Sequence, residues 1–253
     1  MQPQRETTNP KRSAFARLEN RIFMNNRIRT SLLILTSIAL TTTGWSQEPQ
    51  KKATAKYAKD FGAMKARDEA SPPPENCHLF VGSSSIRLWD LEKSWPELDT
   101  INNGFGGSTI AESIQYFDQV IKPYDAQTIV IYAGDNDIGK GLTADATFVD
   151  FKKLAGMIRE NTPDAKVVFI AIKPSIKRWN LWPDMKKANE LIAGYCSENA
   201  GFHFADIAAP MLDTPDKTPD PTLFKSDGLH LNDEGYLVWK KVIEPLLSKS
   251  SEN

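Results

Sequence analysis

The sequence predicts an α/β fold with three α/β/α layers around a five-stranded parallel sheet. Residues 128–132 and 167–172 are nearly continuous apolar runs, which is typical of strands covered on both faces. Such runs alternate with helical segments along the chain, and this alternation indicates a doubly wound sheet with right-handed crossovers. Five strands in this arrangement favour the flavodoxin-like strand order 2-1-3-4-5.

The separate elements follow from the same alternation of short apolar runs, polar loops and longer helical segments. We expect strands at 78–81, 100–102, 128–132, 167–172 and 202–207. We expect helices at 47–70, 110–120, 144–161, 183–199 and 232–247. Three prolines, Pro72 to Pro74, end the first helix, and Asn232 is the expected N-cap of the last one.

The first 46 residues have the composition of a targeting segment. Residues 25–30 carry two arginines and no acid, and the apolar run 31–40 is too short to cross a bilayer. Small residues at 44 and 46 precede an expected cleavage site, so we predict a signal peptide that starts at Met24, and export to the periplasm or the medium. The expected organisation is an extension with signal peptide (1–46), a helix with a Pro-rich linker (47–75) and an α/β domain (76–248).

Bulk composition narrows the class of protein. Apolar residues make up 40% of the chain, enough for a sizeable core. The net charge of −1 gives no excess of positive charge that would favour binding to nucleic acid. We expect no membrane span in the mature protein. The two cysteines, Cys77 and Cys196, are too few for a disulfide framework and lack metal-ligand spacing, so buried thiols are expected. No cofactor or metal is implied, and the oligomeric state is left open.

Residues of the types that catalyse reactions or bind ligands follow all five predicted strands. They lie at 82–85, 103–108, 134–137, 173–182 and 227–230. Because the carboxyl ends of parallel strands share one edge of the sheet, these segments are expected to meet there, where open α/β sheets carry their sites.

Of the three histidines, His230 is the candidate general base. His78 and His203 fall at or within strands, where a structural role is expected, whereas His230 lies on a loop at the functional edge. Asp227 precedes it by three residues, so its carboxylate can orient the imidazole and stabilise the imidazolium. The alternative for this pair is an ordinary surface turn.

A nucleophile and two hydrogen-bond donors complete an acyl-transfer site. The serines at 83–85 follow the first strand, and a base can activate such a hydroxyl. Gly107 can bring a backbone N–H close to substrate, and Asn136 can offer a side-chain N–H to an oxyanion. The alternatives are a turn with an N-cap for the serines and a turn residue for Asn136.

With these blocks the sequence resembles the SGNH, or GDSL-type, hydrolase family of esterases, lipases and acylhydrolases. The resemblance covers about 77–247 and is carried by four segments: Phe80–Ile86, Asn102–Thr109, Gly134–Asp137 and Asp227–His230. It implies a flavodoxin-like sandwich and serine-dependent hydrolysis of carboxylic esters, a serine esterase without a cofactor.

The same resemblance implies roles for individual residues. Ser84 would be the nucleophile, His230 the base and acid, and Asp227 the residue that orients His230. The oxyanion hole would be the N–H groups of Ser84 and Gly107 with the Asn136 side chain. The chain departs from the family pattern at one position, where Ser83 stands in place of the acid that usually precedes the nucleophile.

The alcohol and acyl group are predicted less directly. Arg87, Trp89, Arg178, Trp179 and Trp182 lie near the same edge by sequence, and we expect Arg87, Trp179 and Trp182 to bind substrate. The alternative is that the tryptophans close the core. The expected substrates are short acyl esters, acetyl among them, on sugars or other polar alcohols. Two other classes of function stay open: a flavin- or phosphate-binding module, and a catalytically inactive carbohydrate-binding protein.

Overall fold

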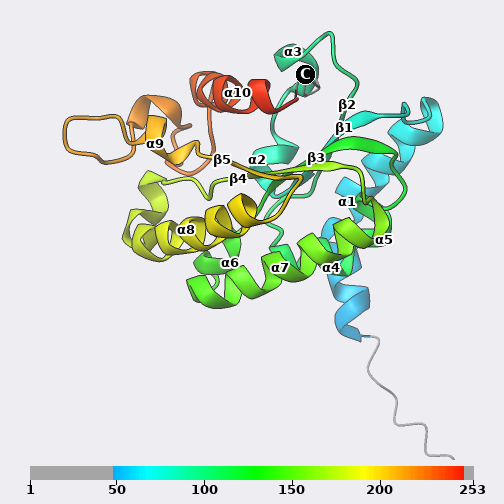
Figure 1. Ribbon diagram of the computed structural model, residues 1–253, viewed down its shortest axis with the longest axis horizontal. Coiled ribbons are helices and arrows are strands. Elements are labelled where there is room, and N and C mark those ends of the chain that lie inside the picture. The colour runs from blue at the N-terminus through cyan, green and yellow to red at the C-terminus, as the bar shows by residue number, and fades with distance from the viewer. Residues whose placement is uncertain (1–47, 248–253) are drawn as a thin grey trace, which may run out of the picture. The chain divides into compact units, whose positions relative to one another are not determined.

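A five-stranded parallel sheet stands at the centre of the protein (Figure 1). Its strands lie in the order β2-β1-β3-β4-β5, which confirms the predicted fold and strand order. The computed structural model describes residues 48–247. The strands are β1 (Cys77–Gly82), β2 (Thr100–Gly104), β3 (Ala126–Tyr132), β4 (Lys166–Ile170) and β5 (Phe202–Ala205).

The central strands are apolar throughout because each face of the sheet is covered by helices (Figure 1). In β3, Ile129 and Ile131 pack into one core cluster, whereas Val130 and Tyr132 pack into the other. The first cluster lies under α1 (Glu48–Ala70), α4 (Ile110–Gln115), α5 (Phe117–Val120), α7 (Ala144–Asn161) and α8 (Trp182–Glu198). The second lies under α2 (Ser84–Arg87), α3 (Leu91–Ser94), α9 (Ala208–Met211) and α10 (Asp233–Leu247).

Three predicted elements differ from the structure. The helix expected at 110–120 is interrupted at Tyr116, which leaves helical geometry (φ −103°, ψ 18°) and packs its ring against Tyr57 and Phe105. The strand expected at 167–172 ends at Ile170; beyond it, the backbone N–H and C=O of Ile172 bond to the Asn189 side chain instead of a neighbouring strand. The last strand likewise ends at Ala205, before the predicted Ile207.

The remaining predicted helices agree with the structure to within about one residue. Asn232 caps α10 as expected, since its Oδ1 accepts from the N–H of Gly235 at 3.0 Å. The shortest elements were not among the predicted ones, because three to six residues show no periodicity. They are the helices α2, α3 and α9, together with α6 (Asp135–Gly139), η1 (Ile176–Leu181) and η2 (Pro221–Leu223).

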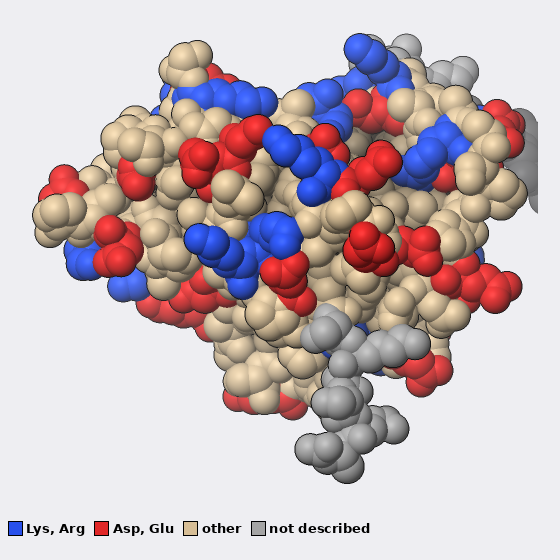
Figure 2. All heavy atoms as spheres, turned by 90° about the horizontal axis from the view of Figure 1, so that it is seen from above, with Lys and Arg blue, Asp and Glu red and all other residues tan. Residues whose placement is uncertain are grey.

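The described part of the chain contains both cysteines as free, buried thiols. Burial raises the pKa of Cys77 to about 11 and that of Cys196 to about 12, so both stay protonated near neutral pH. Within 48–247 no helix has the length and apolarity to cross a membrane. Basic and acidic side chains alternate over the face in Figure 2. The predictions for 1–46, including the signal peptide, lie outside the described residues.

Candidate active site

The first strand delivers Ser84 to the carboxyl edge of the sheet through a turn that only glycine can make. Gly82 ends β1 with a φ of +142°, and a Cβ there would lie 1.9 Å from the carbonyl oxygen of Tyr132 in β3. The chain then turns at Ser83 into α2, whose first residue is Ser84. Ser83 and Ser85 are buried on either side of it, at 1% exposure each, whereas Ser84 is only partly buried.

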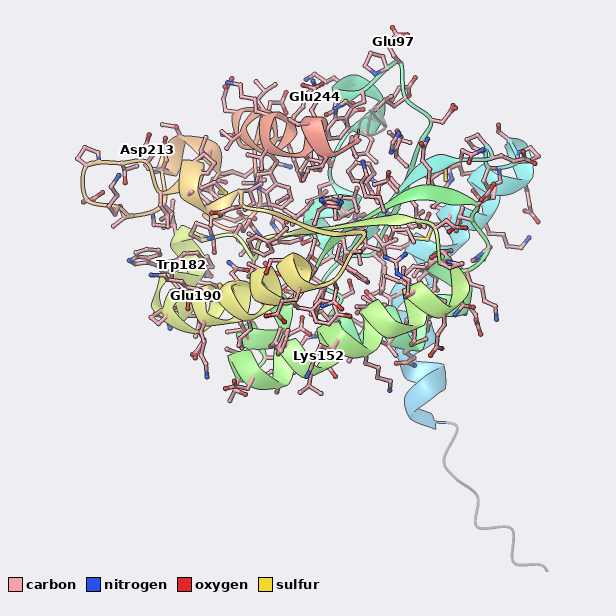
Figure 3. The ribbon with its side chains drawn as sticks, in the orientation of Figure 1. Glu97, Lys152, Trp182, Glu190, Asp213 and Glu244 are labelled. Carbon is pink, nitrogen blue, oxygen red and sulfur yellow. The ribbon has the colours of Figure 1, made fainter. Side chains whose placement is uncertain are left out.

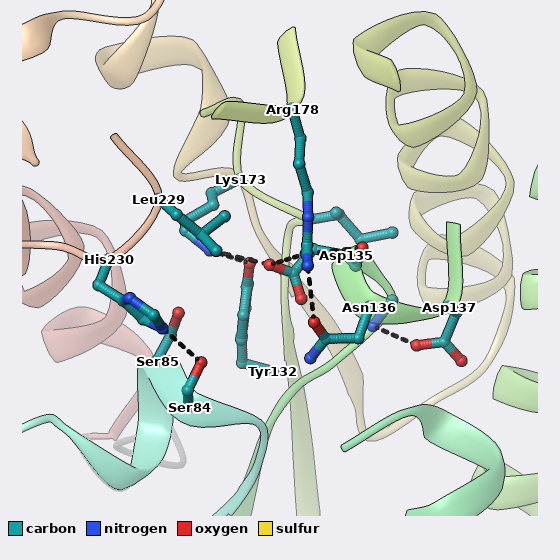
Figure 4. A network of polar contacts seen from close by, with 12 residues as sticks. Ser84, Ser85, Tyr132, Asp135, Asn136, Asp137, Lys173, Arg178, Leu229 and His230 are labelled. Carbon is teal, nitrogen blue, oxygen red and sulfur yellow. Dashed lines mark hydrogen bonds and ion pairs between the residues drawn. The ribbon is translucent and has the colours of Figure 1, made fainter. Parts of the chain in front are cut away.

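Ser84, His230 and Asp227 lie in one line of hydrogen bonds, of which Figure 4 shows the contact between Ser84 and His230. The Ser84 Oγ is 3.0 Å from Nε2 of His230, and Nδ1 of His230 is 2.6 Å from Oδ2 of Asp227. The hydrogen bond with His230 holds the pKa of Asp227 well below its usual range, so Asp227 is a carboxylate that accepts. Nδ1 therefore carries the proton, and Nε2 is free to accept the one on the serine hydroxyl.

The loop that carries the acid and the base is a closed unit. Oδ1 of Asp227 accepts from the backbone N–H groups of Leu229 and His230, both at 2.9 Å. Lys225 donates its N–H to the carbonyl of His230 at 2.8 Å. Gly228, at φ +63°, makes the bend between them. The spacing of Asp227 and His230 is thus set by the local turn and not by long-range packing.

Gly107 and Asn136 belong to two segments that the structure joins. Gly107 takes a φ of +76°, and the neighbouring Gly106 donates its N–H to Oδ2 of Asp60, on α1, at 2.9 Å. Asn136 lies in the first turn of α6, and its Nδ2 donates to the carbonyl of Ser108 at 3.0 Å. The two segments that were predicted to supply oxyanion donors are therefore held together by a hydrogen bond.

Asp137 fixes the position of α6 without facing the reaction. Its carboxylate accepts from the N–H groups of Ile110, at 3.0 Å, and Gly134, at 3.1 Å. Complete burial raises the pKa of Asp137 to about 6 despite these two hydrogen bonds. Through this side chain the start of α4 and the end of β3 hold Asn136 in place.

A buried group of charges next to Asn136 was not predicted. Lys173 donates to Oδ2 of Asp135 at 3.0 Å and to the hydroxyl of Tyr132 at 2.9 Å, and Arg178 lies 3.1 Å from the same Oδ2 (Figure 4). Burial disfavours the carboxylate, but the two cations hold the pKa of Asp135 below its usual value. The sequence placed these residues after β3 and β4, yet nothing in it showed that they pair.

The predicted substrate-binding residues occupy different environments. Arg87 is exposed, and its Nε lies 4.0 Å from Oδ1 of Asp60. Trp179 and Trp182 stack at 6.0 Å between ring centroids with an interplanar angle of 14°, and both stay partly exposed. Trp182 stands at the start of α8 and also packs against both core clusters (Figure 3). Trp89, by contrast, is a core residue that stacks on Tyr236, which agrees with the alternative of a tryptophan that closes the core.

These features define a class: an α/β/α protein with a serine, a histidine and an aspartate in hydrogen-bonded series at the carboxyl edge of its sheet. The model of the GDSL-like lipase/acylhydrolase family matches residues 87–238, which includes Asn136, Asp227 and His230 and begins three residues after Ser84. The chain belongs to the GDSL-like lipase/acylhydrolase family and is therefore an enzyme that hydrolyses ester bonds.

Solved structures share the fold at low sequence identity. A GDSL-like lipase from Bacteroides thetaiotaomicron is 22% identical, with a TM-score of 0.63 over 74% of this chain and 96% of that one. A lipase/acylhydrolase from Enterococcus faecalis is 19% identical, with a TM-score of 0.54 over 68% and 95%. A carbohydrate esterase of family 3 from Talaromyces cellulolyticus is 17% identical, with a TM-score of 0.52 over 67% and 95%. Among curated proteins, none matches the chain.

Proposed function

We propose that this acylhydrolase works through an acyl-enzyme formed on Ser84. The observation that supports it is the unbroken series Ser84 Oγ–His230 Nε2–Asp227, at 3.0 and 2.6 Å. A serine hydroxyl is a weak nucleophile until a base within hydrogen-bond reach removes its proton. His230 is placed to do so, and Asp227 stabilises the imidazolium that results.

In the first half of the reaction, Oγ of Ser84 attacks the ester carbonyl while its proton passes to Nε2 of His230. The carbonyl oxygen becomes an oxyanion, for which the N–H groups of Ser84 and Gly107 and the Asn136 side chain are the proposed donors. The tetrahedral intermediate collapses, the bond to the alcohol oxygen breaks, and His230 returns its proton to that oxygen. Water, deprotonated by His230, then releases the acid from Ser84 in the same way.

We further propose that the substrates are short acyl esters, such as acetyl esters, of sugars or other polar alcohols. Trp179 and Trp182 support this, since a partly exposed aromatic pair can pack against a sugar ring while its polar edge stays wet. The carbohydrate esterase among the structural neighbours points in the same direction.

Replacing both tryptophans with Ala should raise KM far more than it lowers kcat. A preference for acyl chains beyond about eight carbons would contradict the short-acyl proposal.

Export is a proposal that rests on residues 24–46 alone. Fractionation of cells that produce the full chain tests it. Activity in the periplasm or medium, together with a new N-terminus near residue 47, is the expected result. Full-length protein confined to the cytoplasm would contradict it.

The central experiment is labelling with a fluorophosphonate followed by peptide mass spectrometry. The expected result is one adduct on Ser84, absent in Ser84→Ala and present in Ser85→Ala. Label on Ser85, or no label on a folded protein that hydrolyses esters, would refute the acyl-enzyme on Ser84.

A further inference from the structure

We propose that Arg178 is a positioning residue that acts through Asn136, fixing the orientation of its amide so that an N–H and not the carbonyl oxygen faces the reacting oxygen. The inference rests on the proposed ester hydrolysis and adds a residue that lies outside the Ser84, His230 and Asp227 series. Arg178 comes from η1, which follows β4, whereas Asn136 follows β3.

The contacts of Arg178 select one orientation of the Asn136 amide. Nη2 of Arg178 donates to Oδ1 of Asn136 at 3.0 Å (Figure 4). Nδ2 of Asn136 donates to the carbonyl of Ser108, also at 3.0 Å. A rotation of the amide by 180° would place its NH₂ against the guanidinium and its oxygen against the Ser108 carbonyl, so both contacts would become repulsive. With one Nδ2 hydrogen committed to Ser108, the second is left for the oxyanion.

Arg178 is itself held rigidly. Its Nη1 donates to the carbonyl of Asp135 at 2.9 Å and lies 3.1 Å from Oδ2 of the same residue. That carboxylate is held in turn by Lys173, whose side chain is 2% exposed. On the other side, the neighbouring Lys177 donates its backbone N–H to the carbonyl of Gly228 at 2.9 Å, within the loop that carries His230. One segment is thus anchored to both halves of the site.

The net charge of Arg178, Lys173 and Asp135 also supports a role for Asn136 as an oxyanion donor. Arg178 and Lys173 supply two cations against the single carboxylate of Asp135, so these three side chains together carry one net positive charge. A guanidinium on the amide oxygen polarises the amide and strengthens its N–H as a donor. Donors that are fixed in this way stabilise a developing oxyanion without reorganisation.

The test is a double-mutant cycle between Arg178 and Asn136, with kcat and KM measured on p-nitrophenyl acetate. Removal of an oxyanion donor lowers kcat by about 10²–10³, so Arg178→Ala should lower kcat by about 10- to 100-fold, with KM within about threefold. Because Arg178 acts through Asn136, Arg178→Ala should lower kcat by less than about threefold in the Asn136→Ala background. Guanidinium ion should restore part of the kcat of the single variant but not of the double variant.

Arg159→Ala is the matched control. Arg159 is also partly buried and also donates to backbone carbonyls, those of Ala165 and Ala200, away from the carboxyl edge. It should lose thermal stability and keep its kcat. Should Arg178→Ala fail to fold, Arg178→Lys enters the cycle in its place, since one ammonium cannot make the same pair of contacts.

Additive losses in the double variant, or a loss confined to KM, would overturn the role of Arg178. Absence of any ester hydrolysis by the folded wild-type protein would instead refute the proposed function, so the two failures are distinguishable.

Discussion

Asp227→Asn should lower kcat by about three to four orders of magnitude while leaving the fold intact. The substitution keeps the size of the side chain but offers one oxygen where the carboxylate offers two. In the native protein Oδ1 accepts from the backbone N–H groups of Leu229 and His230, and Oδ2 accepts from Nδ1 of His230. The single amide oxygen of the variant can satisfy only one of these two sets.

The tautomer of His230 in the variant depends on which of the two sets the amide oxygen faces: the backbone N–H groups or Nδ1. If the amide oxygen faced His230, two backbone N–H donors would lose their acceptor, whereas the opposite orientation gives up only the hydrogen bond to Nδ1. The oxygen should therefore stay on the backbone, with the NH₂ facing Nδ1. His230 must then take the tautomer protonated on Nε2, which cannot accept the proton of Ser84 at 3.0 Å. The equivalent change in a serine protease lowers kcat by about 10⁴ through the same tautomer.

The assay is hydrolysis of p-nitrophenyl acetate, with thermal unfolding measured on the same preparations. Asp206→Asn is the matched control, because Asp206 also accepts from two backbone N–H groups, those of Ala208 and Ala209, at 3.0 and 3.2 Å. It should keep full activity. A kcat of Asp227→Asn within about tenfold of wild type would refute the tautomer argument.

Three further predictions concern the framework of the site. Asn136→Ala should lower kcat by about 10²–10³ in a protein that still folds; near-normal turnover in steady-state assays would remove Asn136 from the mechanism. Gly82→Ala should prevent soluble folding or lower stability by more than about 3 kcal/mol in urea titrations, because its Cβ would lie 1.9 Å from the carbonyl oxygen of Tyr132 at φ +142°. Burial works against ionisation of Glu112, but hydrogen bonds from Tyr57 and Lys56 outweigh it and lower its pKa to about 2. A depressed folded pKa contributes stability above the ordinary value of 4.5 that is lost as pH falls toward 2, so Glu112→Gln should flatten the decline in Tm over that range; an unchanged slope would count against it.

The sheet and its functional edge could be predicted because they depend on local patterns. Runs such as 128–132 are apolar on both faces only when helices cover both, and this pattern alone indicates a parallel sheet. The acid and base are three residues apart on one loop, so their pairing was also visible in the sequence. Ser84 could be related to them because both segments follow strands of the same sheet.

The parts that escaped prediction depend on contacts between distant segments. The break at Tyr116 involves no glycine or proline and results from ring packing against Tyr57, on α1. The bond from Gly106 to Asp60 joins residues 46 positions apart. The pairing of Lys173 with Asp135 spans 38 positions. Lysine and aspartate are usually exposed, so the sequence did not indicate that these two residues form a buried pair. Such contacts follow from the fold once it is known.

The closed turn at 225–230 has a consequence for how the enzyme can lose and regain alignment. Because Asp227 and His230 belong to the same rigid turn, any displacement of that turn carries acid and base together and leaves their mutual geometry unchanged. Only one separation, from Nε2 to the oxygen of Ser84, then varies. A ligand or a substitution that shifts the turn as a body would therefore change the rate through the distance between Nε2 and Oγ, while the hydrogen bond between Asp227 and His230 stays intact.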